Sequence, residues 1–127
     1  PVVTNETVTF PAAGDTRATL YPSPWNFGDY IQGTRTTSLS SVTGAQMNLA
    51  ISPNGLSCDT QDMRLRINGT IVGNVIIPPG AASVTRSFSF SAISGPSYTF
   101  RLENIRTVAT GCGAAGIPNG STLTLTR

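Results

Sequence analysis

Hydrophobic and polar residues alternate along much of the chain. In six segments, every second residue is apolar and the residues between are mainly polar: 7–10, 46–51, 63–67, 87–91, 98–103 and 122–126. A period of two with one polar face is typical of antiparallel β-strands that are half buried on a core. The pattern predicts strands at these segments, and no segment has the period of a helix.

Turn residues separate the predicted strands. Asn68-Gly69 joins the strand at 63–67 to a second arm at 70–77, and this dipeptide is the strongest hairpin signal in the chain. The arm is apolar on both faces, which predicts a central or covered strand. About eight strands at short spacing predict an all-β fold, an antiparallel two-sheet sandwich of the jelly-roll type. Without an internal repeat or linker, residues 1–127 are expected to form one domain.

Composition narrows the functional classes. Hydrophobic residues make up 39% of the chain and charged residues 11%, a balance that favours a folded protein. No apolar run approaches the roughly 20 residues that a membrane-spanning helix needs. Abundant serine and threonine with few charges are typical of secreted or cell-surface proteins, which is the expected location. The net charge of +2 is too small and too dispersed to predict nucleic-acid binding.

The basic residues are all arginines, and three of them lie on predicted strands. Arg64, Arg66 and Arg101 alternate with apolar residues, so they are expected to share an outward face. Such a face either attracts an anionic polymer or is simply solvated.

The residue types argue against an enzyme. The chain has no histidine and no lysine, which excludes nucleophiles activated by histidine and lysine-based covalent chemistry. A pair of carboxylates would still suffice for glycoside hydrolysis. The acidic residues are Glu6, Asp15, Asp29, Asp59, Asp62 and Glu103. Asp59 and Asp62 are close in sequence, but a solvated or metal-binding role suits such a loop better than an acid–nucleophile pair.

The segment 21–30 contains four of the nine aromatic residues, including Trp25, the only tryptophan. Aromatic rings held on a loop stack on sugar rings, and neighbouring amides and carboxylates hydrogen-bond to sugar hydroxyls. The candidate ligand-binding residues are therefore Tyr21, Trp25, Asn26, Asp29 and Tyr30. The alternative is a loop tucked under the sandwich, in which Trp25 and Phe27 belong to the core.

The segment 52–62 is rich in oxygen-bearing side chains. Calcium takes six to eight oxygen ligands from carboxylates, amides and carbonyls on flexible loops. Asp59 and Asp62, with Asn54 nearby, are the candidate calcium ligands, and calcium is the one cofactor that the sequence indicates. The alternative is an ordinary capped turn.

The two cysteines, Cys58 and Cys112, predict one disulfide, because pairs of cysteines in short secreted domains are usually bonded. The bond would close a loop of roughly 55 residues and stabilise the fold by about 4 kcal/mol. The alternative is two buried free thiols. Mass spectrometry of the unreduced protein is expected to show the bonded form, and a mass matching two free thiols would contradict it.

Three stretches resemble known jelly-roll accessory modules. Residues 60–70 are similar to the Asp-Leu-x-x-x-Leu…Gly-Thr stretch of P-domain-like jelly rolls, and residues 96–104 resemble their Gly-x-Tyr/Trp-x-Leu-x-Val strand. Residues 120–125 fit the final strand of the same fold. The resemblance covers about a third of the chain. Such domains, and the jelly-roll carbohydrate-binding modules, accompany catalytic domains in secreted proteins.

Taken with the residues, this resemblance implies a non-catalytic extracellular module that binds a polysaccharide or other glycan, with a neighbouring catalytic domain as a further partner. Two alternatives stay open: an accessory domain that stabilises or positions a secreted hydrolase, and a structural or adhesive surface domain.

Overall fold

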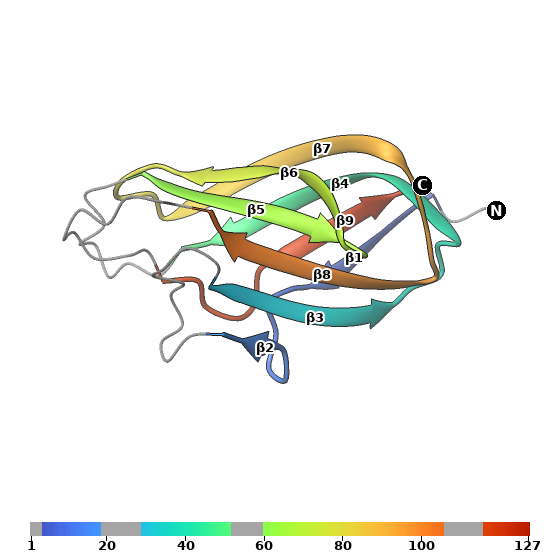
Figure 1. The fold of residues 1–127 in the computed structure, drawn as a ribbon, viewed down its shortest axis with the longest axis horizontal. Helices are drawn as coiled ribbons and strands as arrows, with labels where there is room; N and C mark the ends of the chain where they lie inside the picture. Colours follow the sequence, from blue (N-terminus) through green and yellow to red (C-terminus); the bar gives the residue numbers. More distant parts are fainter. Residues whose placement is uncertain (1–3, 19–28, 52–59, 106–115) are drawn as a thin grey trace.

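The computed structural model describes residues 4–18, 29–51, 60–105 and 116–127, and these residues form nine strands (Figure 1). The strands are β1 (Asn5–Thr9), β2 (Thr16–Arg17), β3 (Tyr30–Thr36), β4 (Ser41–Ala50), β5 (Gln61–Ile67), β6 (Thr70–Ile77), β7 (Ser83–Ser94), β8 (Ser97–Asn104) and β9 (Thr122–Thr126). Among the described residues there is no helix of the length and apolarity that crossing a membrane requires.

The strands form two antiparallel sheets that pack face to face. One sheet has the order β1-β9-β4-β7 and the other the order β2-β3-β8-β5-β6. From β3 onward the chain passes repeatedly from one sheet to the other, as in a jelly roll. The predicted all-β, two-sheet sandwich is therefore confirmed.

The hairpin between β5 and β6 turns at the predicted dipeptide. Asn68 and Gly69 both have positive φ angles, 50° and 82°. This is the requirement of a type I′ turn, and it explains why asparagine and glycine occupy these two positions.

The core consists of the inward halves of the alternating strands. On β8, Tyr98, Phe100 and Leu102 are fully buried, and the apolar residues of β5 and β9 are buried in the same way. The rings of Phe10 and Phe100 lie 5.7 Å apart, and the Tyr98 hydroxyl donates a hydrogen bond of 2.8 Å to the Leu39 carbonyl oxygen. Because alternate residues fill this core, the residues between them must face outward.

The prediction that the strand at 70–77 is central or covered is wrong. In the structure β6 is the edge strand of its sheet, and Ile71 and Ile76 are 49% and 43% exposed. The pairing register shifts between Leu65, which faces Gly73, and Arg66, which faces Ile71. This bulge adds one residue to β6 and reverses its alternation, so Ile71 joins Ile76 on the outward side.

Candidate functional site

The strands β3 and β5 begin at one end of the sandwich, and the strands β4 and β8 finish at the same end (Figure 1). Three predicted site residues, Asp29, Tyr30 and Asp62, lie at this end within the described chain. The Asp29 carbonyl oxygen accepts a hydrogen bond from the Asn104 amide, and the Asp62 carbonyl oxygen accepts one from the Ile105 amide. The starts of β3 and β5 thus flank the end of β8.

The other predicted site residues lie outside the described residues, and their roles stay predictions. They are Tyr21, Trp25 and Asn26 of the aromatic segment, Asp59 of the calcium pair, and the cysteines Cys58 and Cys112. Of the five predicted sugar-binding residues, the structure places Asp29 and Tyr30.

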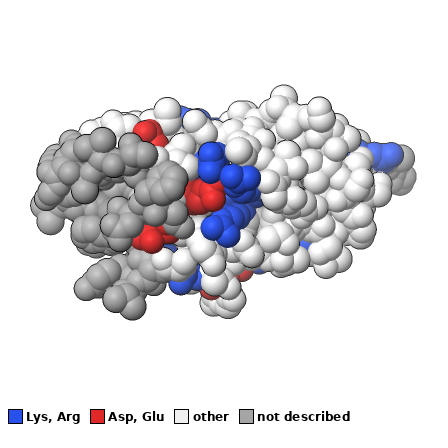
Figure 2. Space-filling view, viewed as in Figure 1, with Lys and Arg blue, Asp and Glu red and all other residues white. Residues whose placement is uncertain are grey.

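The outer face of the five-stranded sheet, which points away from the four-stranded sheet, carries the polar half of the alternation. The pairing register sets its side chains in rows across the strands, and two neighbouring rows run through Glu103 and Arg101. The first row is Tyr30, Glu103, Arg64 and Asn74. The second row is Gln32, Arg101, Arg66 and Ile71. Figure 2 shows that basic and acidic side chains gather together near the middle of this view, while most of the rest of the described surface is uncharged.

Glu103 joins three arginines, and we call these four residues the Glu103 cluster. The Nε atoms of Arg64 and Arg66 each donate to Glu103 Oε1 at 2.7 Å, and Arg101 Nε donates to Oε2 at 3.2 Å. The side chain of Glu103 is 10% exposed, and those of the arginines are between a quarter and a third exposed. One nearly buried carboxylate therefore orients three guanidinium groups.

The pKa of Glu103 reflects two opposing effects. Burial by itself raises the pKa, whereas the hydrogen bonds and positive charges of Arg66 and Arg64 lower it. The net result is a pKa below the ordinary value for glutamate. Glu103 is therefore ionised at neutral pH and accepts hydrogen bonds rather than donating a proton.

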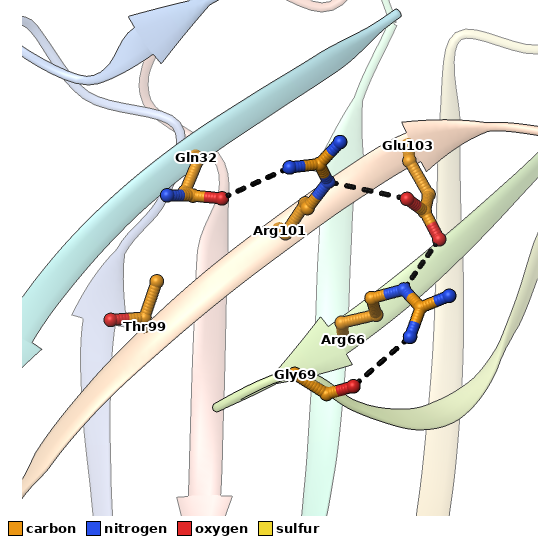
Figure 3. Close-up of a pocket in the computed structure, with 6 residues that line it drawn as sticks. All are labelled: Gln32, Arg66, Gly69, Thr99, Arg101 and Glu103. Carbon is orange, nitrogen blue, oxygen red and sulfur yellow. Dashed lines mark hydrogen bonds and ion pairs between the residues drawn. The ribbon is translucent and has the colours of Figure 1, made fainter. Parts of the chain in front are cut away.

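Further contacts fix the arginines around Glu103. Arg66 Nη1 donates to the Gly69 carbonyl oxygen at 3.0 Å, and Arg101 Nη1 lies 3.4 Å from Gln32 Oε1 (Figure 3). The Arg101 guanidinium carbon also lies 3.6 Å from the centre of the Tyr30 ring, a cation–π contact. One face of Tyr30 is thus covered by Arg101, so the predicted stacking role of this ring is limited to its other face.

The outer face is hollowed beside the Glu103 cluster. A depression of about 320 Å³ is lined by Gln32, Arg66, Gly69, Thr99, Arg101 and Glu103 (Figure 3). A second depression of about 400 Å³ shares Gln32 and extends over Thr34, Thr16 and the ion pair of Arg35 with Asp15. The two depressions together cross β5, β8, β3 and β2, and their amides, hydroxyls and guanidinium groups can hydrogen-bond to a ligand with many hydroxyls.

Asp62 is the part of the predicted calcium site that the structure describes. It lies on β5 and is partly exposed. The neighbouring Gln61 is fully buried, and both polar atoms of its side chain have no hydrogen-bond partner among the described residues. Successive side chains of a strand point to opposite faces, so Gln61 and Asp62 do not converge on one ion. No group of three or more candidate metal-binding side chains occurs within the described part of the chain, so a calcium ion at Asp62 would need ligands from elsewhere.

Sequence reasoning identified the outward arginines but missed the residue that joins them. Glu103 entered the sequence prediction as one of several acidic residues, and Gln32 and Thr99 were not considered. The available signal was the alternation in Arg64-Leu65-Arg66 and Arg101-Leu102-Glu103, which places all four side chains outward. The missing information was the register that sets Glu103 opposite Arg64.

Comparison with solved structures identifies the fold class. The chain is similar to the CBM36-1 domain of a multidomain xylanase from the hindgut metagenome of Trinervitermes trinervoides, with a TM-score of 0.63, 14% identity and 97% of each chain covered. It is similar to the carbohydrate-binding module CBM36 in complex with calcium and xylotriose, with a TM-score of 0.60, 17% identity, and 95% of this chain and 99% of that one covered. The carbohydrate-binding module CBM35 from Paenibacillus barcinonensis has a TM-score of 0.55 at 16% identity, with 96% of this chain and 98% of that one covered.

The predicted resemblance to jelly-roll carbohydrate-binding modules is therefore confirmed at the level of the fold. No protein-family model matches the sequence, and no curated protein matches it. At these identities the comparisons define an architecture and assign no ligand to this chain.

Replacing Glu103 by glutamine is expected to lower the free energy of unfolding by about 1–3 kcal/mol at pH 7, because the charged acceptor of three arginines is lost. The folded pKa of Glu103 lies below its unfolded value of about 4.3. The stabilisation is therefore present above the unfolded pKa and is lost as the pH falls through the folded pKa.

Urea unfolding at a series of pH values between 7 and 3 tests this. The stability difference between the original chain and Glu103→Gln should shrink at the acidic end. Glu6→Gln, which removes a carboxylate on β1 in the other sheet, is the control. A difference that stays constant with pH would mean that the pKa of Glu103 does not change on folding, which contradicts its lowered pKa in the folded chain.

Proposed function

We propose that residues 1–127 act as one non-catalytic extracellular module that binds carbohydrate across the outer face of the five-stranded sheet. The observation that carries the proposal is the pair of neighbouring depressions that share the lining residue Gln32 and cross the strands. A glycan presents hydroxyls along its length, and this face offers an amide, hydroxyls and guanidinium groups in reach of one another. The similarity in fold to carbohydrate-binding modules, one of them in complex with xylotriose, supports this proposal.

The aromatic segment is proposed to extend this surface at one end. Tyr30 is the first residue of β3 and lies opposite Glu103 in the pairing register, and Asp29 precedes it. The sequence supports adding Tyr21, Trp25 and Asn26, because Pro22 and Pro24 restrict the backbone and reduce the ordering cost when a ring binds a sugar.

Secretion or cell-surface display, and a catalytic domain elsewhere in the same protein, belong to the proposal. A structure of similar fold is a domain of a multidomain xylanase, which supports this setting. The second candidate is an accessory domain that contacts a hydrolase, and the exposed Ile71 and Ile76 on edge strand β6 favour it. A glycan array separates the two candidates, since a purely accessory domain would bind no glycan.

Calcium is proposed as a ligand at Asp62 with Asp59. An ion that binds only the folded chain raises the apparent stability by mass action. Saturating calcium is expected to raise the melting temperature relative to excess chelator, and Asp62→Asn should reduce that shift. An identical melting temperature with calcium and with chelator would contradict the proposed calcium site.

Replacing Trp25 by alanine tests the aromatic segment. If Trp25 is a stacking platform, affinity for polysaccharide falls while the melting temperature changes little, and the loss persists in salt that screens surface charges. Trp25→Phe, which keeps an aromatic ring, is the matched control and should retain part of the affinity. A loss of about 3–5 kcal/mol of stability on Trp25→Ala would instead place the ring in the core and contradict its ligand role.

A further inference from the structure

The Glu103 cluster carries more positive charge than its own carboxylate neutralises. Three guanidinium groups share one carboxylate, which leaves an excess of two positive charges. Asp62, at the next outward position on β5, reduces the excess to one. In the pairing register Arg66 lies directly opposite Arg101, and like charges directly opposite on neighbouring strands are destabilising. The sheet holds this arrangement at the surface of a depression rather than dispersing the charge.

The guanidinium groups have more donors than the described acceptors use. Each arginine uses Nε for Glu103, and Arg66 and Arg101 each use Nη1 for a second acceptor. Within the described part of the chain, no residue accepts a hydrogen bond from Nη2 of Arg66 or Arg101. The same holds for both terminal nitrogens of Arg64. The contacts with Glu103 therefore orient donors that no described residue uses.

We propose that the outer face recognises an acidic glycan, with the carboxylate of a uronate sugar bound by the terminal guanidinium nitrogens of Arg66 and Arg101, which line the depression, and with Arg64 beside them on Glu103. This inference rests on the proposed carbohydrate-binding function and names its ligand class. A planar carboxylate matches the donor fork of a guanidinium group. It would also offset the repulsion between Arg66 and Arg101. Gln32 and Thr99, which line the same depression, bind the hydroxyls of that sugar.

The dimensions and chemistry of the face favour an acidic glycan over a nucleic acid. The depression of about 320 Å³ is at the lower end of the volumes of small-ligand pockets, and so suits one ring-sized group. An excess of one or two charges is small beside the many phosphate contacts that nucleic-acid binding uses. Stacking of bases needs free aromatic faces, and one face of Tyr30 is occupied by Arg101.

The test compares polygalacturonate with its fully methyl-esterified form, which has the same backbone without the charge. Titration calorimetry at low ionic strength is expected to show at least about tenfold tighter binding of the acid form, because a hydrogen bond to a charged group contributes roughly that factor. Binding should weaken as salt is added. Dextran sulfate and duplex DNA are the competing anionic probes, and both should bind more weakly than polygalacturonate.

The double variant Arg64→Gln/Arg66→Gln should lose at least about tenfold in affinity for polygalacturonate. Arg127→Gln changes the charge of an exposed residue outside the cluster and should bind like the original chain. If the double variant does not fold, Arg66→Gln alone serves, because Arg66 lines the depression.

The outcomes separate this inference from the proposed function. Equal binding of the acid and the ester, or tighter binding of dextran sulfate or DNA, overturns the uronate proposal. Binding of neutral polysaccharide alone overturns it as well, yet leaves the carbohydrate-binding function standing. Binding of no polysaccharide of any kind contradicts both.

Discussion

The outer face of the five-stranded sheet depends on one carboxylate. Glu103 accepts the Nε hydrogens of three arginines from two strands, and without it Arg66 and Arg101 would face each other with no counter-charge between them. The same contacts lower the pKa of Glu103 despite its burial, so the carboxylate stays charged wherever the protein works near neutral pH. The interaction that stabilises this face therefore also determines which donors it presents to a ligand.

The core and the site are two consequences of the same alternation. Leu102 is buried between Arg101 and Glu103, and Leu65 is buried between Arg64 and Arg66. Each leucine fixes the direction in which its charged neighbours point, because a strand cannot turn one side chain inward without turning the next one outward. A rigid sheet holds such groups more accurately than a loop does.

Period-two patterning was sufficient to predict the sandwich, and Asn68-Gly69 was sufficient to predict its clearest hairpin. The pattern failed at β6, because the bulge beside Leu65 reverses the alternation; Gly73, which lies at this bulge, is the residue that could have marked it in the sequence. Outward arginines were predictable, but the Glu103 cluster was not: Arg66 and Arg64 lie 37 and 39 residues before Glu103, and only the register brings them together. The roles of Trp25, Asp59 and the two cysteines remain predictions from residue type.

The central claim is that carbohydrate lies across the outer face of the five-stranded sheet. The most direct measurement is an NMR titration with an oligogalacturonate that follows backbone amides and the Nε–H groups of the arginines. If carbohydrate lies there, the largest shifts are expected at Arg66 and Arg101, followed by Arg64 and the amides of Gln32 and Thr99. Shifts confined to the exposed residues of β7 in the other sheet, Thr85, Ser87 and Ser89, would contradict it.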